Sequence, residues 1–304
     1  MAASEARESQ DPRSGVDPLV SVVIPVRNGA ATIGEQLQAL SRQSFHGRWE
    51  VVVADNGSTD GTAEVAAQYR SSLPDLRIIS APDGLGINFA RNAGVRAARG
   101  SLILICDADD VVQPGWIAAH VRTLDEYDLS GGPVDEVLLN TERVARFNAG
   151  NLPDRLPVCG AFLPYAIGCN LAFHREVWER IGGFDDAWQR GSTEIEFCWR
   201  AQLAGFTIGW APDAVVAYRH SPYIRSEVQR RYRSARSMPR LFAAFRRHGM
   251  PRRSLRRAIL AWAWLVYRAP WALTSDRWRM KWIQVGAWRA GLLAGSLRYR
   301  VLYL

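Results

Sequence analysis

The first part of the chain, to about residue 110, alternates short apolar runs with longer mixed segments. Short runs rich in Val, Ile and Leu are typical of buried strands, and the first mixed segment carries Ile33, Leu37 and Leu40 at helical spacing. The pattern predicts strands at 19–26, 49–55, 76–80 and 102–106, and helices at 30–43, 63–71 and 86–99. Such alternation predicts an α/β domain with a Rossmann-like, mostly parallel central sheet flanked by helices.

The last of these strands ends abruptly in acidic residues. Asp107, Asp109 and Asp110 follow the apolar run 102–106. Side chains two apart on an extended segment share a face, so Asp107 and Asp109 can point the same way. Neighbouring carboxylates repel each other unless a cation lies between them, and their oxygens suit Mg²⁺ or Mn²⁺. The alternative is an acidic turn before the helix that opens near Pro114, which Asp110 alone could cap.

Polar clusters follow three of the predicted strands, at 25–28, 55–58 and 107–109. In parallel α/β sheets, ligands bind at the carboxyl ends of the strands, where these clusters would lie. The glycine-rich pattern of a dinucleotide-binding Rossmann domain is missing after the first strand, and the P-loop pattern is missing as well. The sequence therefore predicts a nucleotide site that uses carboxylates and a metal ion in place of a glycine-rich phosphate loop.

Four segments carry a family resemblance. SVVIPVRNGAATI, VVVADNGSTDGT, ARNAGVRAARG and LILICDADD, in this order, resemble the family 2 glycosyltransferases of GT-A fold, over about Val20 to His220. The resemblance implies an inverting, metal-dependent enzyme that transfers a sugar from a nucleoside-diphosphate sugar, with UDP the commoner nucleotide, to an acceptor hydroxyl. The acceptor could be a sugar, a lipid-linked molecule or a small molecule. The alternative from another functional class is a non-catalytic nucleotide-sugar-binding scaffold.

The resemblance assigns donor-binding roles near the first three strands. Asp55 would accept a hydrogen bond from the nucleotide base, and Pro25 and Asn28 would line the same pocket. Arg91 would lie near the diphosphate or the sugar. A helix cap is the alternative for Asp55, and a surface ion pair is the alternative for Arg91.

The resemblance also implies a metal site. Asp107 and Asp109 would hold the ribose and a Mn²⁺ or Mg²⁺ ion that bridges the diphosphate. Such an ion offsets charge that develops on the leaving group. The segment 210–220 resembles the closing strand of the fold, and His220 at its end is a further candidate ligand, since imidazole can join oxygen ligands on Mn²⁺. A solvated histidine at a strand end is the alternative.

The segment 168–186 resembles the family's segment beneath the donor sugar, where Asn170 is a candidate donor contact. Farther on, Thr193 with Glu196 predicts a capping box at the start of a helix. Glu194 has no such structural explanation, and the helix dipole favours an ionised carboxylate in the first turn. The resemblance places the family's catalytic base, normally an Asp, at the position of Glu194. We therefore assign Glu194 as the general base and Glu196 as a cap and second candidate, with Arg200 holding these carboxylates in place.

The charge is divided unevenly along the chain. From Arg219 to the end there are 20 Lys and Arg against two acids, a net charge of +18, whereas the preceding residues carry −10. Helices interrupted at Pro239, Pro251 and Pro270 are expected there, and six of the twelve Trp lie between Trp262 and Trp288. Arg-rich faces interleaved with Trp and Leu suit an anionic membrane surface. A dimer interface or packing on the acidic body are alternatives; nucleic acid is not expected, because no recognition motif is present.

These observations divide the chain into three parts. Residues 1–18 are polar, resemble no secretory signal and are expected to be a disordered lead-in. Residues 19–220 form the glycosyltransferase domain, with a nucleotide-binding half at 19–110 and an acceptor half at 111–220. Residues 221–304 form a basic, Trp- and Arg-rich helical extension. The longest apolar run there has ten residues and a bilayer span needs about twenty, so we expect a cytoplasmic protein with peripheral attachment to the inner face of the cell membrane.

Overall fold

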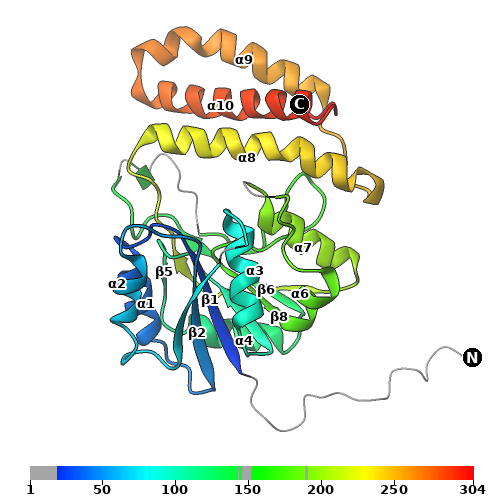
Figure 1. Ribbon diagram of the computed structural model, residues 1–304. Coiled ribbons are helices and arrows are strands. Elements are labelled where there is room, and N and C mark those ends of the chain that lie inside the picture. Colours follow the sequence, from blue (N-terminus) through cyan, green and yellow to red (C-terminus); the bar gives the residue numbers. More distant parts are fainter. Residues whose placement is uncertain (1–18, 82, 143, 146–151, 189–190) are drawn as a thin grey trace, which may run out of the picture.

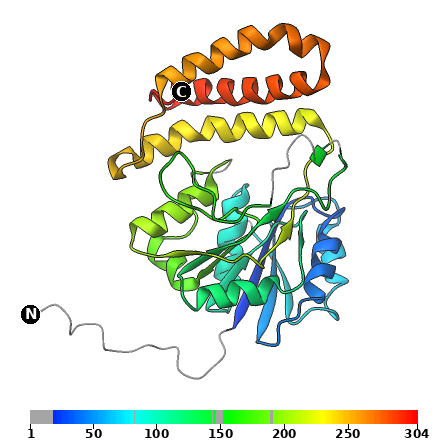
Figure 2. The same ribbon diagram turned by 180° about the vertical axis from the view of Figure 1, so that it is seen from behind.

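The computed structural model describes residues 19–81, 83–142, 144–145, 152–188 and 191–304. An α/β domain (residues 19–220) lies beneath a layer of three long helices formed by the C-terminal part of the chain (Figure 1; Figure 2). The predicted α/β architecture and the helical extension are confirmed. The predicted disordered lead-in at 1–18 lies outside the described residues.

The central sheet has seven strands. They are β1 (Val20–Val26), β2 (Trp49–Asp55), β3 (Leu76–Ser80), β4 (Leu102–Ile105), β6 (Leu129–Gly131), β8 (Leu171–His174) and β9 (Ile208–Trp210). Their order across the sheet is β3-β2-β1-β4-β8-β6-β9. The four N-terminal strands pair in parallel, as expected for βαβ units, whereas β8 runs antiparallel to both β4 and β6.

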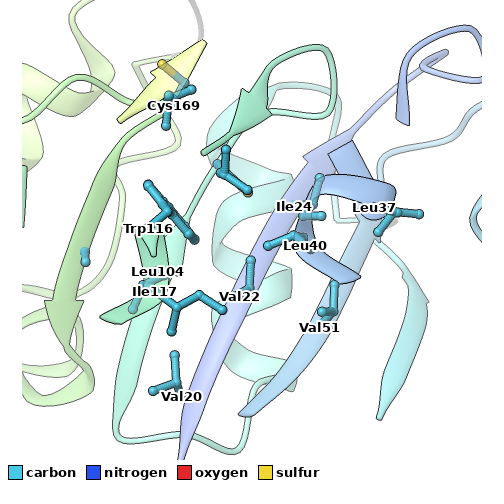
Figure 3. Packing of buried hydrophobic residues seen from close by; sticks show 14 of the residues in the cluster. Val20, Val22, Ile24, Leu37, Leu40, Val51, Leu104, Trp116, Ile117 and Cys169 are labelled. Carbon is cyan, nitrogen blue, oxygen red and sulfur yellow. The ribbon is translucent and has the colours of Figure 1, made fainter. Parts of the chain in front are cut away.

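Helices cover both faces of this sheet. They are α1 (Ile33–Ser41), α2 (Thr62–Ala67), α3 (Ile87–Ala97), α4 (Trp116–Leu124), α6 (Arg175–Ile181) and α7 (Thr193–Leu203). Alternate residues of β1 serve opposite faces, because side chains on a strand alternate. Val22 and Ile24 belong to the core shared with Leu37 of α1 and Trp116 of α4 (Figure 3), whereas Val23 belongs to the core shared with α3, α6 and α7.

The register of the parallel strands brings the polar clusters to one edge. Val26 at the end of β1 pairs with Asp55 at the end of β2, and Val23 pairs with Ile105 at the end of β4. The segments that follow these three strands therefore emerge side by side. This edge faces the helical layer, as both ribbon views show (Figure 1; Figure 2).

A second, three-stranded sheet has the order β5-β10-β7 and consists of β5 (Val111–Val112), β10 (Val216–Ala217) and β7 (Val134–Asp135). The prediction of one closing strand at 210–220 is wrong. A turn in which Ala214 N–H donates to the Ala211 carbonyl separates β9 from β10, so the two belong to different sheets.

The helical layer consists of α8 (Ile224–Phe245), α9 (Leu255–Thr274) and α10 (Asp276–Arg298), with a short 3₁₀ turn at Arg246–His248. The prediction of breaks at Pro239 and Pro270 is wrong, because both prolines lie inside continuous helices. Packing stabilises α8 at this point: Pro239 is buried against α10 at Gly295. Among the described helices, none is both long enough and apolar enough to cross a bilayer.

The helical layer is packed on the α/β domain and is not a free tail. Trp188, Ile195 and Trp199 of the domain share one core with Leu241 of α8 and Leu292 of α10. Two glycines let α10 approach α8 closely, since a Cβ at Gly291 would lie 2.4 Å from the Tyr232 carbonyl oxygen and one at Gly295 equally near that of Arg236. The helical layer therefore forms part of the surroundings of the strand ends.

Candidate active site

A cavity of about 640 Å³ lies between the strand ends of the α/β domain and the helical layer. The domain contributes Arg91, Asp107 and Glu194 to its lining, and the helical layer contributes Met238 from α8 and Trp288 from α10. The helical layer also contributes Arg230 and Ser234 of α8, so both sides of the cavity present polar as well as apolar groups. Cavities of this size, with a few convergent polar groups, are typical of small-molecule sites.

Arg91 joins two of the carboxylates that line this cavity, those of Asp107 and Glu194. The residue as a whole is 3% exposed; Nη2 lies 3.7 Å from Asp107 Oδ1, and Nη1 donates to Thr193 Oγ1 at 3.1 Å. The Thr193 hydroxyl in turn donates to Glu194 Oε2 at 2.9 Å. Nη2 also donates to the Gly168 carbonyl at 3.2 Å, so the guanidinium is held from several sides. The buried Arg91 guanidinium therefore orients the carboxylate of Asp107 directly and the carboxylate of Glu194 through Thr193.

Asp107 belongs to a cluster of groups that could hold a metal ion. One ligand atom each from Asp107, Asp110 and Cys169 lies within 4.8 Å of the others. Oδ1 of Asp107 and Oδ2 of Asp110 are buried and have no hydrogen-bond partner among the described residues. Asp107 Oδ1 has the 3.7 Å ion pair with Arg91 but accepts no hydrogen bond from the described side chains or backbone. A hard divalent cation therefore fits beside it and Asp110 Oδ2.

Burial and mutual repulsion perturb these carboxyls. Burial raises the pKa of Asp107 to about 6; Arg91 opposes the rise, and Asp109 and Glu194 add to it. Burial, followed by the charges of Asp107 and Asp109, raises the pKa of Asp110 to about 8. Burial also raises the pKa of the Cys169 thiol, which makes it a weaker ligand than the two carboxylates. A bound cation would reverse the repulsion and keep both carboxyls ionised.

The other two predicted metal ligands lie elsewhere. The Asp109 side chain is exposed, and its place in the described cluster is taken by Asp110. His220 turns Nε2 to Glu136 Oε1 at 3.2 Å and Nδ1 to Glu227 Oε2 at 3.4 Å. Burial alone would lower the pKa of His220, but its bonds to Glu136 and Glu227 raise it above the ordinary value. The assignment of Asp109 and His220 to the metal stays a prediction that this arrangement does not favour.

Glu194 and Glu196 have different surroundings in α7. Glu194 faces the cavity, whereas Glu196 is 5% exposed in its side chain and forms a bidentate ion pair with Arg200. Arg200 therefore holds Glu196 and does not reach both carboxylates. The predicted capping box is wrong, because Ser192 is the N-cap and Thr193 is the first residue of α7. The hydroxyl of Thr193 is thereby free to bond to Glu194 instead of capping the helix.

The three residues predicted to contact the nucleotide base, Pro25, Asn28 and Asp55, do not belong to the described lining of the cavity. Pro25 is buried within β1, and Asp55 at the end of β2 accepts a hydrogen bond from Ser58 N–H at 2.9 Å. Asn28 has a left-handed backbone (φ 54°), and its Oδ1 accepts from Thr59 N–H at 2.9 Å. The Asp55 bond closes the turn after β2, and the Asn28 bond ties the turns after β1 and β2 together. The donor-binding role of all three stays a prediction.

Asn170 is fully buried, with no exposed surface, and its hydrogen-bonding capacity is used within the protein. Oδ1 lies 2.8 Å from both the Trp116 indole nitrogen and His120 Nε2, while Nδ2 donates to the carbonyls of Pro133 and Ala214. It therefore joins α4 to the segments that precede β7 and β10. This placement gives Asn170 a structural role and does not support the prediction that it contacts the donor.

The sequence did not indicate the roles of three residues: Asp110 and Cys169 in the candidate metal cluster, and Thr193 between Arg91 and Glu194. Asp110 was assigned only as a possible helix cap and Thr193 only as part of a capping box, and Cys169 was not assigned to a site. The adjacent acids at 109–110 were a signal for Asp110, but its burial depends on Arg219, whose backbone N–H donates to Asp110 Oδ1 at 2.8 Å. No local pattern indicates that pairing.

Comparison with known proteins identifies the family. A family model described as "Glycosyl transferase family 2" matches residues 21–182, and one described as "Glycosyl transferase family group 2" matches residues 102–294. Glycosyltransferase AglE of Haloferax volcanii is 30% identical over 213 residues, which are 68% of this chain and 68% of that protein. The chain belongs to glycosyltransferase family 2. As a member of this family it is an enzyme of glycosyl transfer, so the scaffold alternative falls away.

Solved structures agree on the fold of this family 2 glycosyltransferase. The mannosyltransferase PcManGT from Pyrobaculum calidifontis, in complex with GDP-Man and Mn²⁺, has a TM-score of 0.61 at 23% identity; the match covers 91% of this chain and 87% of that chain. S. aureus TarS 1-349 in complex with UDP has a TM-score of 0.55 at 18% identity, over 94% and 93% of the two chains. At these identities the likeness shows the GT-A fold.

Proposed function

We propose that this glycosyltransferase is metal-dependent and inverting, and that it uses a nucleoside-diphosphate sugar, with UDP the first candidate, to glycosylate a hydroxyl. The observation that carries the proposal is the shared cavity: Glu194 and Asp107 both line it, and Arg91 is linked to both carboxylates. A base and an acidic, cation-suited group that line the same cavity are what a single displacement requires.

Glu194 is the general base in this proposal. Its carboxylate accepts the proton of the acceptor hydroxyl, and the oxygen attacks the anomeric carbon from the face opposite the diphosphate. The new carbon–oxygen bond forms as the bond to the phosphate oxygen breaks, and the electron pair leaves with the nucleoside diphosphate. One displacement inverts the configuration. Thr193 and Arg91 hold Glu194 in one orientation, which favours a reactive geometry.

Asp107 and Asp110 would hold the divalent cation, Mn²⁺ or Mg²⁺, and Arg91 would face the diphosphate beside them. Bound there, the cation supplies stabilisation of the negative charge on the leaving diphosphate. The fit rests on the two buried carboxylate oxygens that accept no hydrogen bond from the described residues. Support for the donor class comes from related structures, since PcManGT is complexed with GDP-Man and TarS 1-349 with UDP.

Nucleotide release from a panel of UDP- and GDP-sugars, with and without Mn²⁺, tests this proposal. We expect release from one nucleotide class, dependent on metal and accelerated by the right hydroxyl acceptor. Proton NMR of the first product then reports the configuration at the anomeric carbon, which we expect to be opposite to that of the donor. Retained configuration would refute the single displacement, and metal-independent release would refute the role of Asp107 and Asp110.

A further inference from the structure

The outermost element of the molecule is α9. In both ribbon views α10 lies between α9 and α8, so two helices separate α9 from the α/β domain (Figure 1; Figure 2). The buried residues of α9 are Ala258, Leu265 and Ala272, spaced seven apart along one stripe. A stripe this narrow leaves most of the circumference of α9 uncovered by the described part of the chain.

The uncovered side of α9 is apolar. Val266 is 77% exposed and Leu273 is 82% exposed, and Ile259, Leu260 and Tyr267 are also more than half exposed. Single exposed apolar side chains are ordinary on soluble proteins, but a series along one helix marks a surface that docks on something. The exposure extends over the whole length of α9.

A groove of about 660 Å³ adjoins this surface between α9 and α10. Its walls include Trp262 and Val266 from α9 and Trp282 and Ile283 from α10, and its lining is almost entirely apolar. At Gly286 a Cβ would meet its first neighbour only at 3.9 Å, so the floor is open. The groove thus extends the apolar surface inward and has room for part of a hydrocarbon chain.

The charges on α9 indicate what kind of partner its apolar surface contacts. Its sequence contains Arg256, Arg257 and Arg268 and no acidic residue. The Arg268 guanidinium lies 4.4 Å from the ring centroid of Trp278 and 5.2 Å from that of Trp271. Arginines bind phosphate groups through paired N–H donors, and indole rings favour the headgroup level of a bilayer. Apolar side chains flanked by arginine and tryptophan, without acids, complement an anionic lipid surface.

We propose that α9 lies in the interface of an anionic lipid bilayer. Val266, Leu273 and their exposed apolar neighbours enter the boundary of the acyl chains, and Arg256 and Arg257 pair with lipid phosphates. The helix lies along the surface and does not span it, in accord with the lack of a spanning helix among those described. This attachment is independent of which sugar the enzyme transfers.

Vesicle flotation of the full chain tests the proposal. The vesicles are phosphatidylcholine alone or phosphatidylcholine mixed with phosphatidylglycerol. We expect the wild-type chain to float with the anionic vesicles and to bind the neutral ones at least about tenfold more weakly. The double variant Val266→Asp/Leu273→Asp should lose at least about tenfold in binding to anionic vesicles, and Arg256→Glu/Arg257→Glu should do the same. Both pairs are exposed, so the fold tolerates these changes.

Leu203→Asp is the matched control, because Leu203 is 42% exposed on α7 of the α/β domain. It should float like the wild type. Failure of the wild-type chain to bind anionic vesicles, or unchanged binding by Val266→Asp/Leu273→Asp, would overturn the proposal. Analytical ultracentrifugation of the same proteins adds a second readout: a wild-type dimer that this double variant dissociates, with no binding to vesicles, would show that α9 contacts a second copy instead of lipid.

Discussion

The hydroxyl of Thr193 donates a 2.9 Å hydrogen bond to Oε2 of its neighbour Glu194 and accepts one from Arg91. It is the link between the buried guanidinium and the proposed base. Thr193→Val removes this link at nearly constant volume. We expect kcat to fall by about tenfold or more because the carboxylate loses its fixed orientation, with little change in the KM for the donor. Steady-state kinetics of Thr193→Ser, which keeps a hydroxyl, provides the control: equal losses in the two variants would contradict this role.

Replacement of the two glutamates of α7 should separate chemistry from stability. Glu194→Gln should lower kcat by about 10²–10⁴ because the base is removed, and nucleotide binding should be retained. Glu196→Gln should lower the free energy of unfolding by about 1–3 kcal/mol, because it weakens the buried ion pair with Arg200, and should leave most of the activity. Turnover assays and urea denaturation of both variants measure the two effects. Full turnover in Glu194→Gln would move the base to Glu196.

Asn170 should prove to be a structural residue. In Asn170→Ala, the Trp116 indole, the His120 ring and the carbonyls of Pro133 and Ala214 each lose a buried partner. We expect the free energy of unfolding to fall by at least about 3 kcal/mol, because each unsatisfied buried group is costly. Urea denaturation measures this loss. An unchanged midpoint together with weakened donor binding would return Asn170 to the donor site.

Glu227 couples α8 to the α/β domain in a pH-dependent way. Burial would raise the pKa of Glu227, but bonds from His220 and Arg230 lower it to about 2. A folded-state pKa below the ordinary value of 4.5 stabilises the fold above that value, and this stability is lost as the pH falls toward 2. We therefore expect Glu227→Gln to melt below the wild type at neutral pH. The difference in Tm should shrink below about pH 4.5; a difference independent of pH would contradict the ionic origin.

The sequence predicted the strands and helices of the α/β domain well because local patterns of apolar residues determine them. The apolar runs at 20–26 and 49–55 coincide with β1 and β2 because both strands are buried on both faces of the sheet, and the run at 76–80 coincides with the half-buried edge strand β3. Prediction failed where long-range packing decides. Pro239 stays inside α8 because α10 covers it. This contact joins residues that are far apart in the sequence, so a local pattern cannot predict it.

The same limit applies to the site. The sequence indicated the acidic stretch at 107–110 and Glu194 by their positions at the end of a strand and the start of a helix. Asp107 and Glu194 both line the cavity. Met238 and Trp288 also line it, yet they belong to segments that the pattern described only as a basic extension. Their place in the cavity depends on the packing of α8 and α10 over the domain.

The most direct test of the central claim is a thermal shift measurement with UDP and GDP, each with and without Mn²⁺. A ligand bound only by the folded state stabilises it by about 2.7 kcal/mol at a hundredfold excess over Kd. We expect one nucleotide to raise Tm only when Mn²⁺ is present, and Asp107→Asn to abolish the shift. Asp213→Asn, at an exposed surface ion pair, is the control and should shift like the wild type. No shift with either nucleotide and Mn²⁺, or a full shift in Asp107→Asn, would contradict a metal-dependent nucleotide site at the end of β4.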